Sequence, residues 1–172
     1  MQHIETLWRA GGSGPALVRD VMSREVRWCR AWDTLEHAAR LMWEHDCGAL
    51  PVVDDHGRPI GMITDRDICM AAYTQGRSLS QIQVSVAASR CLHFVRPGAP
   101  LDLACAEMRA QRVRRLAVID VGGNLIGVVS FSDIARCACR LDRESIDSGA
   151  VVAVVADVSR PSRPPPTPPR AD

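Results

Sequence analysis

The chain of 172 residues lacks an excess of charge of either sign, because 21 basic residues offset 20 acidic ones and leave a net charge of +1. Such a balance supplies no general attraction to nucleic acid or to acidic membrane surfaces. No apolar run reaches the roughly 18 residues that a membrane-spanning helix needs. The N-terminus also lacks the charged, apolar and small-residue succession of a signal peptide. These absences predict a cytoplasmic protein that contacts neither membrane nor nucleic acid.

Seven cysteines are present, but the chain lacks a Cys-x-x-Cys pair and their number is odd. The pairs His45-x-Cys47 and Cys137-x-Cys139 do not have the spacing of a closed zinc site. Several of the thiols fall in apolar, periodic segments, where a cysteine of a cytosolic protein is usually a small core residue. We therefore expect core cysteines and no metal site.

An internal repeat, offset by 66 residues without a gap, is the strongest feature that the chain contains. Ile60–Ile68 lies over Ile126–Ile134, and sliding residues 20–70 onto 86–136 gives about 14 identities in 51 pairs. Two copies are too few for a solenoid. The repeat instead predicts a pseudo-symmetric pair that buries a shared face and has equivalent clefts between its halves.

Each copy follows one order: an extended segment, a helix, a strand, a turn, a strand and a closing helix. In the first copy these are Val26–Cys29, a helix opened by Asp33, Leu50–Val53, Asp54–Gly57, Pro59–Ile63 and a helix from Thr64 to about Ala72. In the second copy they are Leu92–Val95, a helix with Pro100 in its first turn, Leu116–Ile119, Asp120–Gly123, Leu125–Val129 and a helix from Ser130 to about Arg140. This order predicts an α+β fold of two pseudo-symmetric units, each a small sheet with helices packed on one side.

The motifs Thr64-x-x-Asp67 and Ser130-x-x-Asp133 are the strongest local signals. A hydroxyl followed three residues later by a carboxylate is, first of all, a capping box at a helix start. A helix start also offers free N–H groups and a positive dipole end, which suit a phosphate, and its carboxylate can accept both hydroxyls of a ribose. Because the motif occurs twice, each time after glycine and two apolar residues, ligand binding is favoured over capping alone.

At these residues the chain resembles the CBS (cystathionine-β-synthase) domain family in its tandem arrangement, the Bateman module. The segments that carry the resemblance are Val21–Ser23, Leu50–Asp54, Gly57–Ile68, Arg114–Asp120 and Gly127–Asp133. The domains expected from it are a flexible arm at 1–16, a first CBS domain with its linker at 17–82, a second CBS domain at 83–142, and a valine-rich segment with a disordered proline-rich tail at 143–172.

The resemblance implies a regulatory module that binds an adenosine-containing ligand (AMP, ADP, ATP, S-adenosylmethionine or NAD) in the clefts between the copies. It implies ribose and phosphate contacts from Asp67 with Thr64 and from Asp133 with Ser130. It also implies adenine contacts from Ser23 to Val26 and from Ser89 to Leu92, and phosphate contacts from Arg66, Arg114 and Arg115. Family members form homodimers, so we expect a homodimer that signals to an effector protein of unknown identity, without catalytic residues or a catalytic cofactor.

The copies also differ, which predicts unequal clefts. Gly48-Ala49 occupies the place of Arg114-Arg115, and Ala117 replaces Pro51. The arginines have a second interpretation, as a solvated turn or a dimer contact. Two other functions remain open: an interaction scaffold with vestigial nucleotide sites, and a small enzyme. The histidines that an enzyme would use lack a supporting spacing; these are His37, His45, His56 and His93.

Overall fold

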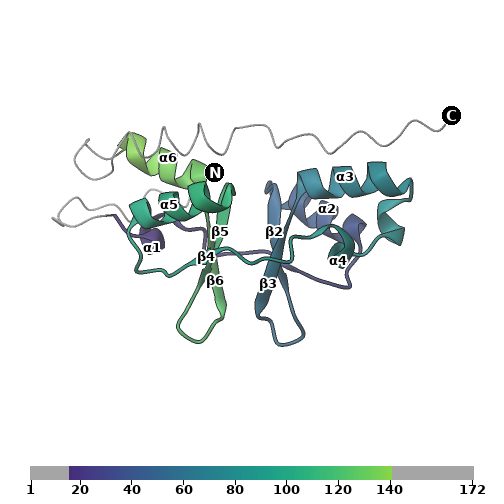
Figure 1. Ribbon diagram of the computed structural model, residues 1–172, viewed down its shortest axis with the longest axis horizontal. Coiled ribbons are helices and arrows are strands. Elements are labelled where there is room, and N and C mark those ends of the chain that lie inside the picture. The colour runs from purple at the N-terminus through teal and green to yellow at the C-terminus, as the bar shows by residue number, and fades with distance from the viewer. Residues whose placement is uncertain (1–15, 141–172) are drawn as a thin grey trace.

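Two similar halves stand side by side, with their helices along one edge and their hairpins projecting from the other (Figure 1). The computed structural model describes residues 16–140, so the valine-rich segment and the proline-rich tail lie outside the described residues, as does nearly all of the expected arm. Each half contains a three-stranded sheet, with strand order β1-β2-β3 in the first and β4-β5-β6 in the second. The predicted α+β fold of two pseudo-symmetric units is confirmed.

The elements follow the predicted order in both halves. The first half contains β1 (Cys29–Arg30), α2 (Leu35–Glu44), β2 (Ala49–Val53), β3 (Pro59–Thr64) and α3 (Asp65–Gln75). The second contains β4 (Phe94–Val95), α5 (Leu101–Gln111), β5 (Arg115–Ile119), β6 (Leu125–Ser130) and α6 (Phe131–Arg140). Short helices precede each half: α1 (Val18–Val21), and the 3-10 turn η1 (Leu79–Gln81) with α4 (Val84–Ala87). In each sheet the first strand is parallel to the second, and the third is antiparallel to it.

The hairpin turns form for the reason the sequence indicates. Gly57 and Gly123 adopt φ angles of 75° and 83°, which glycine reaches without steric cost. The Asp54 carboxylate accepts the N–H groups of His56 and Arg58 at 2.9 and 2.8 Å. These donors stabilise the charged form of the acid, and the bond from Arg58 in particular lowers the pKa of Asp54 below its usual 3.8.

Two helices begin one or two residues later than predicted. The hydroxyl of Thr34 accepts the N–H of His37, so Thr34 is the N-cap and α2 starts at Leu35. Asp33 does not open the helix, because its carboxylate accepts the N–H of Arg30 at 2.7 Å in the turn before it. Pro100 is likewise the N-cap of α5 and does not lie in its first turn.

The short helices are exchanged between the halves. In Figure 1, α1 lies with the second half and α4 with the first. The N–H of Val84 donates to the carbonyl of Asp33 at 2.8 Å, and the N–H of Val18 donates to the carbonyl of Ala99 at 2.9 Å. Each of these valines is fully buried in the core of the half that it joins. The halves are thereby connected by packing as well as by the chain, across the predicted boundary between residues 82 and 83.

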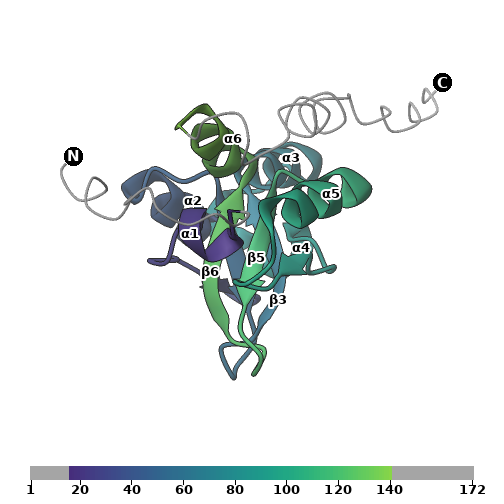
Figure 2. The ribbon, with the colours of Figure 1, turned by 90° about the vertical axis from the view of Figure 1, so that its left-hand side faces the viewer.

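Both cores lie between a sheet and its helices, as the end-on view shows (Figure 2). The first is built around Leu35, Leu50 and Ile63, and the second around Leu101, Leu116 and Ile134. The expectation of core cysteines is met by Cys29, Cys105 and Cys137, which are buried, but Cys69 and Cys91 are exposed. Burial disfavours the thiolate and raises the pKa of Cys29 to about 12.

Candidate functional site

The two hydroxyl–carboxylate motifs have nearly the same geometry. Thr64 ends β3 and caps α3: its N–H and its hydroxyl both donate to Asp67 Oδ2, at 3.0 and 2.7 Å. Ser130 ends β6, and its N–H and hydroxyl donate to Asp133 Oδ2 at 2.9 and 2.6 Å. The capping box predicted as the alternative interpretation is therefore present in both copies. In each carboxylate the Oδ2 atom accepts the bonds of the capping box, which leaves the Oδ1 atom for another partner.

The second oxygen distinguishes the copies. Asp133 Oδ1 accepts a hydrogen bond from the guanidinium of Arg136, one helical turn further on. Asp67 Oδ1 has no protein partner among residues 16–137, since the residue equivalent to Arg136 is Met70. We had not predicted a role for Arg136, although its spacing of three residues from an aspartate on a helix is a recognisable pairing signal. Among the described residues, the motif aspartate therefore has an oxygen without a protein partner in the first copy and not in the second.

The glycine before each motif admits a chain segment from the other copy. The backbone of Ser89 bonds to Met62 at 2.9 Å, and a methyl group on Gly61 would overlap the Ser89 carbonyl oxygen. In the equivalent place, Ser23 exchanges two hydrogen bonds with Val128, at 2.9 and 3.0 Å, beside Gly127. The predicted adenine-flanking segments therefore begin next to the strands that end in the motifs.

Within these segments the side chains are differently engaged. Ser23 and Ser89 are exposed, and Val26 and Leu92 are half-buried. The Ser89 hydroxyl donates to the carbonyl of Cys91 at 2.9 Å and accepts its N–H at 3.3 Å. The Ser89 hydroxyl is thus committed to a local turn that also engages the N–H and the carbonyl of Cys91.

The replacement of Pro51 by Ala117 changes one hydrogen bond. The N–H of Ala117 donates to the carbonyl of His93 at 3.1 Å. Pro51 has no N–H, so the carbonyl of Arg27, which corresponds to that of His93, cannot receive the same bond in the first copy. An acceptor next to the first adenine-flanking segment stays open for this reason.

The three predicted phosphate-binding arginines lie at different places. Arg66 is exposed in the first turn of α3, and Arg114 is exposed before β5. Arg115 is half-buried and reaches toward the first copy. A methyl group placed on Gly48 would lie 3.2 Å from Arg115 Nη2 and 3.0 Å from Asp65 Oδ2, so both side chains lie beside Gly48. The first copy has no arginine of its own before β2. Arg115 of the second copy instead lies beside the start of α3 in the first copy.

Two surface cavities lie away from the motif residues. One, of about 530 Å³, lies between α2 and α3 and includes Trp43, Cys47, Asp65 and Cys69. The other, of about 430 Å³, lies between β4 and α5. Within residues 16–137 no group of three or more His, Cys, Asp or Glu side chains could hold a metal ion. Among the helices of residues 16–140, none has the length and hydropathy of a membrane span.

Comparison with protein families matches the CBS domain twice, at residues 18–73 and 84–139. The chain belongs to the CBS domain family. The CBS domain-containing protein YhcV of Bacillus subtilis is 38% identical over 118 residues, which are 69% of this chain and 82% of that protein. Hypoxic response protein 1 of Mycobacterium tuberculosis is 36% identical over the same shares.

Solved structures agree with this assignment. That of Hypoxic Response Protein I with two coordinated zinc ions has a TM-score of 0.65 and 34% identity, and the match covers 74% of this chain and all of that one. The CBS domain pair of protein MJ0100, in complex with 5′-methylthioadenosine and S-adenosylmethionine, has a TM-score of 0.64 and 25% identity, over 71% of this chain and 98% of that one. Relatives named as enzymes match differently, since only 26% of the L-aspartate semialdehyde sulfurtransferase of Methanocaldococcus jannaschii is covered.

Proposed function

We propose that the chain is a regulatory module without catalysis of its own, which binds an adenosine-containing ligand at the first CBS copy. The observation that carries the proposal is the free Oδ1 of Asp67 at the start of α3, held in place because Oδ2 accepts two bonds from Thr64. The free oxygen of this fixed carboxylate can accept a ribose hydroxyl. The first N–H groups of α3 are already bonded to Gly48, Asp65 and Thr64, so a phosphate would depend on arginine side chains.

Three further features favour the first copy over the second. Arg115 supplies a cation beside Asp65 and Gly48, and Arg66 is exposed on the same helix turn. The carbonyl of Arg27 is open to the amino group of an adenine, because Pro51 cannot donate to it. In the second copy, Arg136 engages Asp133, and Ala117 engages the carbonyl of His93.

A nucleotide bound in this place would contact both CBS copies. A change in how the two copies pack would then reach the surfaces that contact other proteins. Trp43, Tyr73 and Met70 leave an apolar face exposed on α2 and α3, by 88, 82 and 46%. We propose this face for the homodimer, and an effector protein for the module's output. The relative solved with methylthioadenosine and S-adenosylmethionine supports adenosine chemistry as the ligand class.

A second candidate is an interaction scaffold whose nucleotide sites are vestigial. One observation favours it: in the second copy both oxygens of the Asp133 carboxylate are engaged within the protein, by Ser130 and by Arg136. Ligand titration separates the two functions, because a scaffold gains no stability from any adenosine compound.

The test is calorimetric and thermal-shift titration with AMP, ADP, ATP, NAD and S-adenosylmethionine on the wild type, Asp67→Asn and Asp133→Asn. A ligand at 100 times its dissociation constant stabilises the folded state by about 2.7 kcal/mol. We expect this shift in the wild type and Asp133→Asn and its loss in Asp67→Asn, each compared with its own unliganded melting temperature. Equal losses in both variants would contradict the preference for the first copy, and no shift with any ligand would favour the scaffold.

The role of Arg115 is tested by a phosphate comparison. Arg115→Ala should weaken the binding of ATP or AMP about tenfold, in the range of a charge-assisted contact, and should change S-adenosylmethionine, which has no phosphate, much less. Arg114→Ala is the matched control, because Arg114 is the exposed neighbour. Equal effects of the two substitutions would assign Arg115 to general electrostatics.

A further inference from the structure

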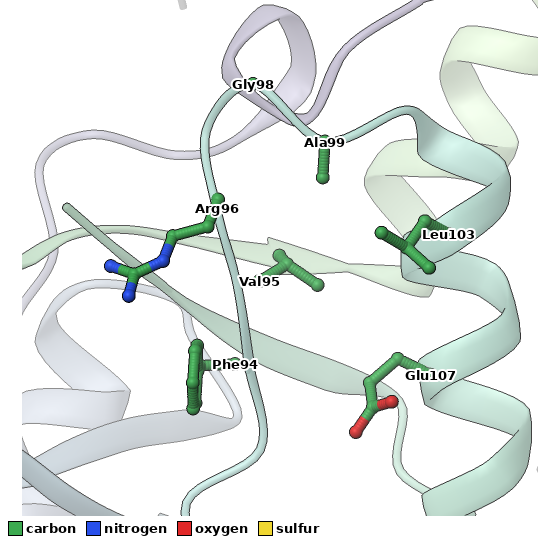
Figure 3. A pocket seen from close by; sticks show the side chains of 7 residues that line it. All are labelled: Phe94, Val95, Arg96, Gly98, Ala99, Leu103 and Glu107. Atoms are coloured by element: carbon green, nitrogen blue, oxygen red, sulfur yellow. The ribbon is translucent and has the colours of Figure 1, made fainter. Parts of the chain in front are cut away.

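The cavity between β4 and α5 is an apolar groove with one acidic group. We call it the β4 groove; it is lined by Phe94, Val95, Gly98, Ala99, Leu103 and Glu107, and Arg96 stands at its rim (Figure 3). Phe94 and Leu103 are 43 and 57% exposed on its walls. Figure 3 shows Leu103 and Glu107 projecting from α5 toward β4 across the groove. Its floor and walls are thus suited to an apolar side chain.

The β4 groove has one cation and one carboxylate, and they are engaged differently. The Arg96 guanidinium is already used, since Nη1 donates to the carbonyls of Ile119, at 3.3 Å, and Asp120. It also lies 5.6 Å from the centroid of the Phe94 ring. Glu107, in contrast, has neither an ion pair nor a hydrogen bond from its side chain among residues 16–137. A half-buried carboxylate in an apolar groove gains from a cationic partner.

The first copy has a ridge where the second has this groove. The two backbones make the same turn, because the N–H of Asp33 donates to the carbonyl of Arg30 at 3.1 Å and that of Ala99 to Arg96 at 3.0 Å. Trp32 therefore occupies the position of Gly98, where no atom lies within 4 Å of an added methyl group. One side of the groove is open because the second copy lacks this tryptophan.

The ridge consists of Trp28, Arg30 and Trp32. The Arg30 guanidinium lies 5.6 and 5.5 Å from the centroids of the Trp28 and Trp32 rings. Both indoles remain 44 and 46% exposed, and the Arg30 side chain has no carboxylate partner among the described residues. Trp and Arg are the residue types that dominate the binding energy of protein interfaces.

We propose that the ridge of one chain docks in the β4 groove of a second, identical chain. An indole, Trp32, enters beside Phe94 and Leu103, and the Arg30 guanidinium pairs with Glu107. Both surfaces are apolar, and they carry opposite charges, Arg30 on the ridge and Glu107 in the groove. Each chain has one ridge and one groove, and the proposed contact runs head to tail. It uses the outer strands β1 and β4, apart from the face of α2 and α3, and does not depend on nucleotide binding.

The test uses two variants, one that has only the groove and one that has only the ridge, and then mixes them. Trp32→Gly gives the first copy the turn residue of the second, which removes the ridge and leaves the groove. Glu107→Arg blocks the groove and leaves the ridge. Sedimentation velocity between about 1 and 500 μM, the range of small and weak interfaces, should show head-to-tail association of the wild type. Each variant alone should lose at least about tenfold in this association.

A mixture of the two variants should form a complex, because the intact ridge of Glu107→Arg fits the intact groove of Trp32→Gly. The double variant Arg30→Glu/Glu107→Arg, which reverses the pair, should recover association to within about threefold of the wild type. Circular dichroism melting verifies that each variant is folded. Trp43→Ala, on the exposed face of α2, is the control that identifies association through the helices and should leave the mixing result unchanged. A mixture without a complex, or a double variant without recovery, would overturn the proposal.

Discussion

Trp32 and Gly98 occupy equivalent positions in the two CBS copies, yet the backbone turns around them in the same way. The hydrogen bonds of the two turns measure 3.1 and 3.0 Å, and those that attach the exchanged helices measure 2.8 and 2.9 Å. The side chains on the same segments differ in size, charge and partners. Backbone contacts that hold the halves together thus have the same geometry in both copies. The surfaces differ: a ridge in the first copy corresponds to a groove in the second, and an aspartate with a free oxygen corresponds to one bonded to Arg136.

The substitutions with the largest expected effect test whether the two halves contribute equally to the stability of one cooperative unit. Leu50→Ala and Leu116→Ala each empty an equivalent, fully buried position and should each lower the free energy of unfolding by about 2 to 5 kcal/mol. Both variants should unfold in a single transition, since each half is completed by a helix from the other. Urea denaturation followed by fluorescence and circular dichroism measures this, and two separate transitions in either variant would break the comparison.

A second pair of substitutions probes the crossing points. Gly61→Ala meets the Ser89 backbone, whereas Gly127→Ala meets Met22 Sδ at 2.8 Å and the Ser23 carbonyl oxygen at 3.0 Å. A thioether moves more easily than a backbone carbonyl. We expect a loss of about 3 kcal/mol for Gly61→Ala and about 1 kcal/mol for Gly127→Ala. Gly98→Ala, with free space around it, is the control and should change stability by less than about 0.5 kcal/mol. The reverse order for the two crossing glycines would contradict the geometry.

The ends of α2 and α5 allow a smaller, stabilising comparison. Asp46 and Arg112 occupy equivalent positions with φ angles of 48° and 54°. Aspartate tolerates this left-handed conformation better than arginine does, and glycine tolerates it best. Arg112→Gly should therefore raise stability by about 0.5 to 1 kcal/mol, and Asp46→Gly should raise it less. Thermal melting decides this, with Ala110→Gly inside α5 as a control that should destabilise by about 1 kcal/mol.

The hairpin turns should give the smallest effect, which appears only in acid. Donors from Arg58 and Asn124 lower the pKa values of Asp54 and Asp120 below 3.8 in the folded protein. The unfolded chain then binds more protons as the pH falls through this region, so the stabilisation by each carboxylate is complete above about pH 5 and is lost below pH 4. Asp54→Ala should have a flatter pH dependence of the urea midpoint between pH 5 and 3. An unchanged slope would show that the turn donors contribute nothing.

Much of the fold could be predicted from the sequence because its signals are local. The hairpins follow from Asp54 and Gly57 with their counterparts, and the helix starts follow from hydroxyl and carboxylate spacing. The predicted starts were wrong by one or two residues at α2 and α5, since Asp33 served the preceding turn and Pro100 served as a cap. Local patterns alone do not tell which of two adjacent polar or rigid residues takes the cap.

The exchange of α1 and α4 could not be predicted, because four-residue helices have no periodicity and their contacts join residues about 50 to 80 positions apart. At the candidate site, the motif residues were identified from their spacing. The hydrogen-bond partners of the two motif carboxylates were not predicted. That difference depends on Arg136 against Met70 and on the reach of Arg115 across the copies. Such contacts are set by the register of strands that are distant in sequence.

The crossing of the short helices also explains how such a chain could arise. A single copy with its own leading helix cannot complete itself, since that helix is directed to a partner. Two identical copies, however, could complete each other, each donating its leading segment to its neighbour. Joining two such genes end to end would preserve every one of these contacts within one polypeptide. The present protein has the form of a swapped dimer joined in one polypeptide, in which each half supplies the short helix that the other needs.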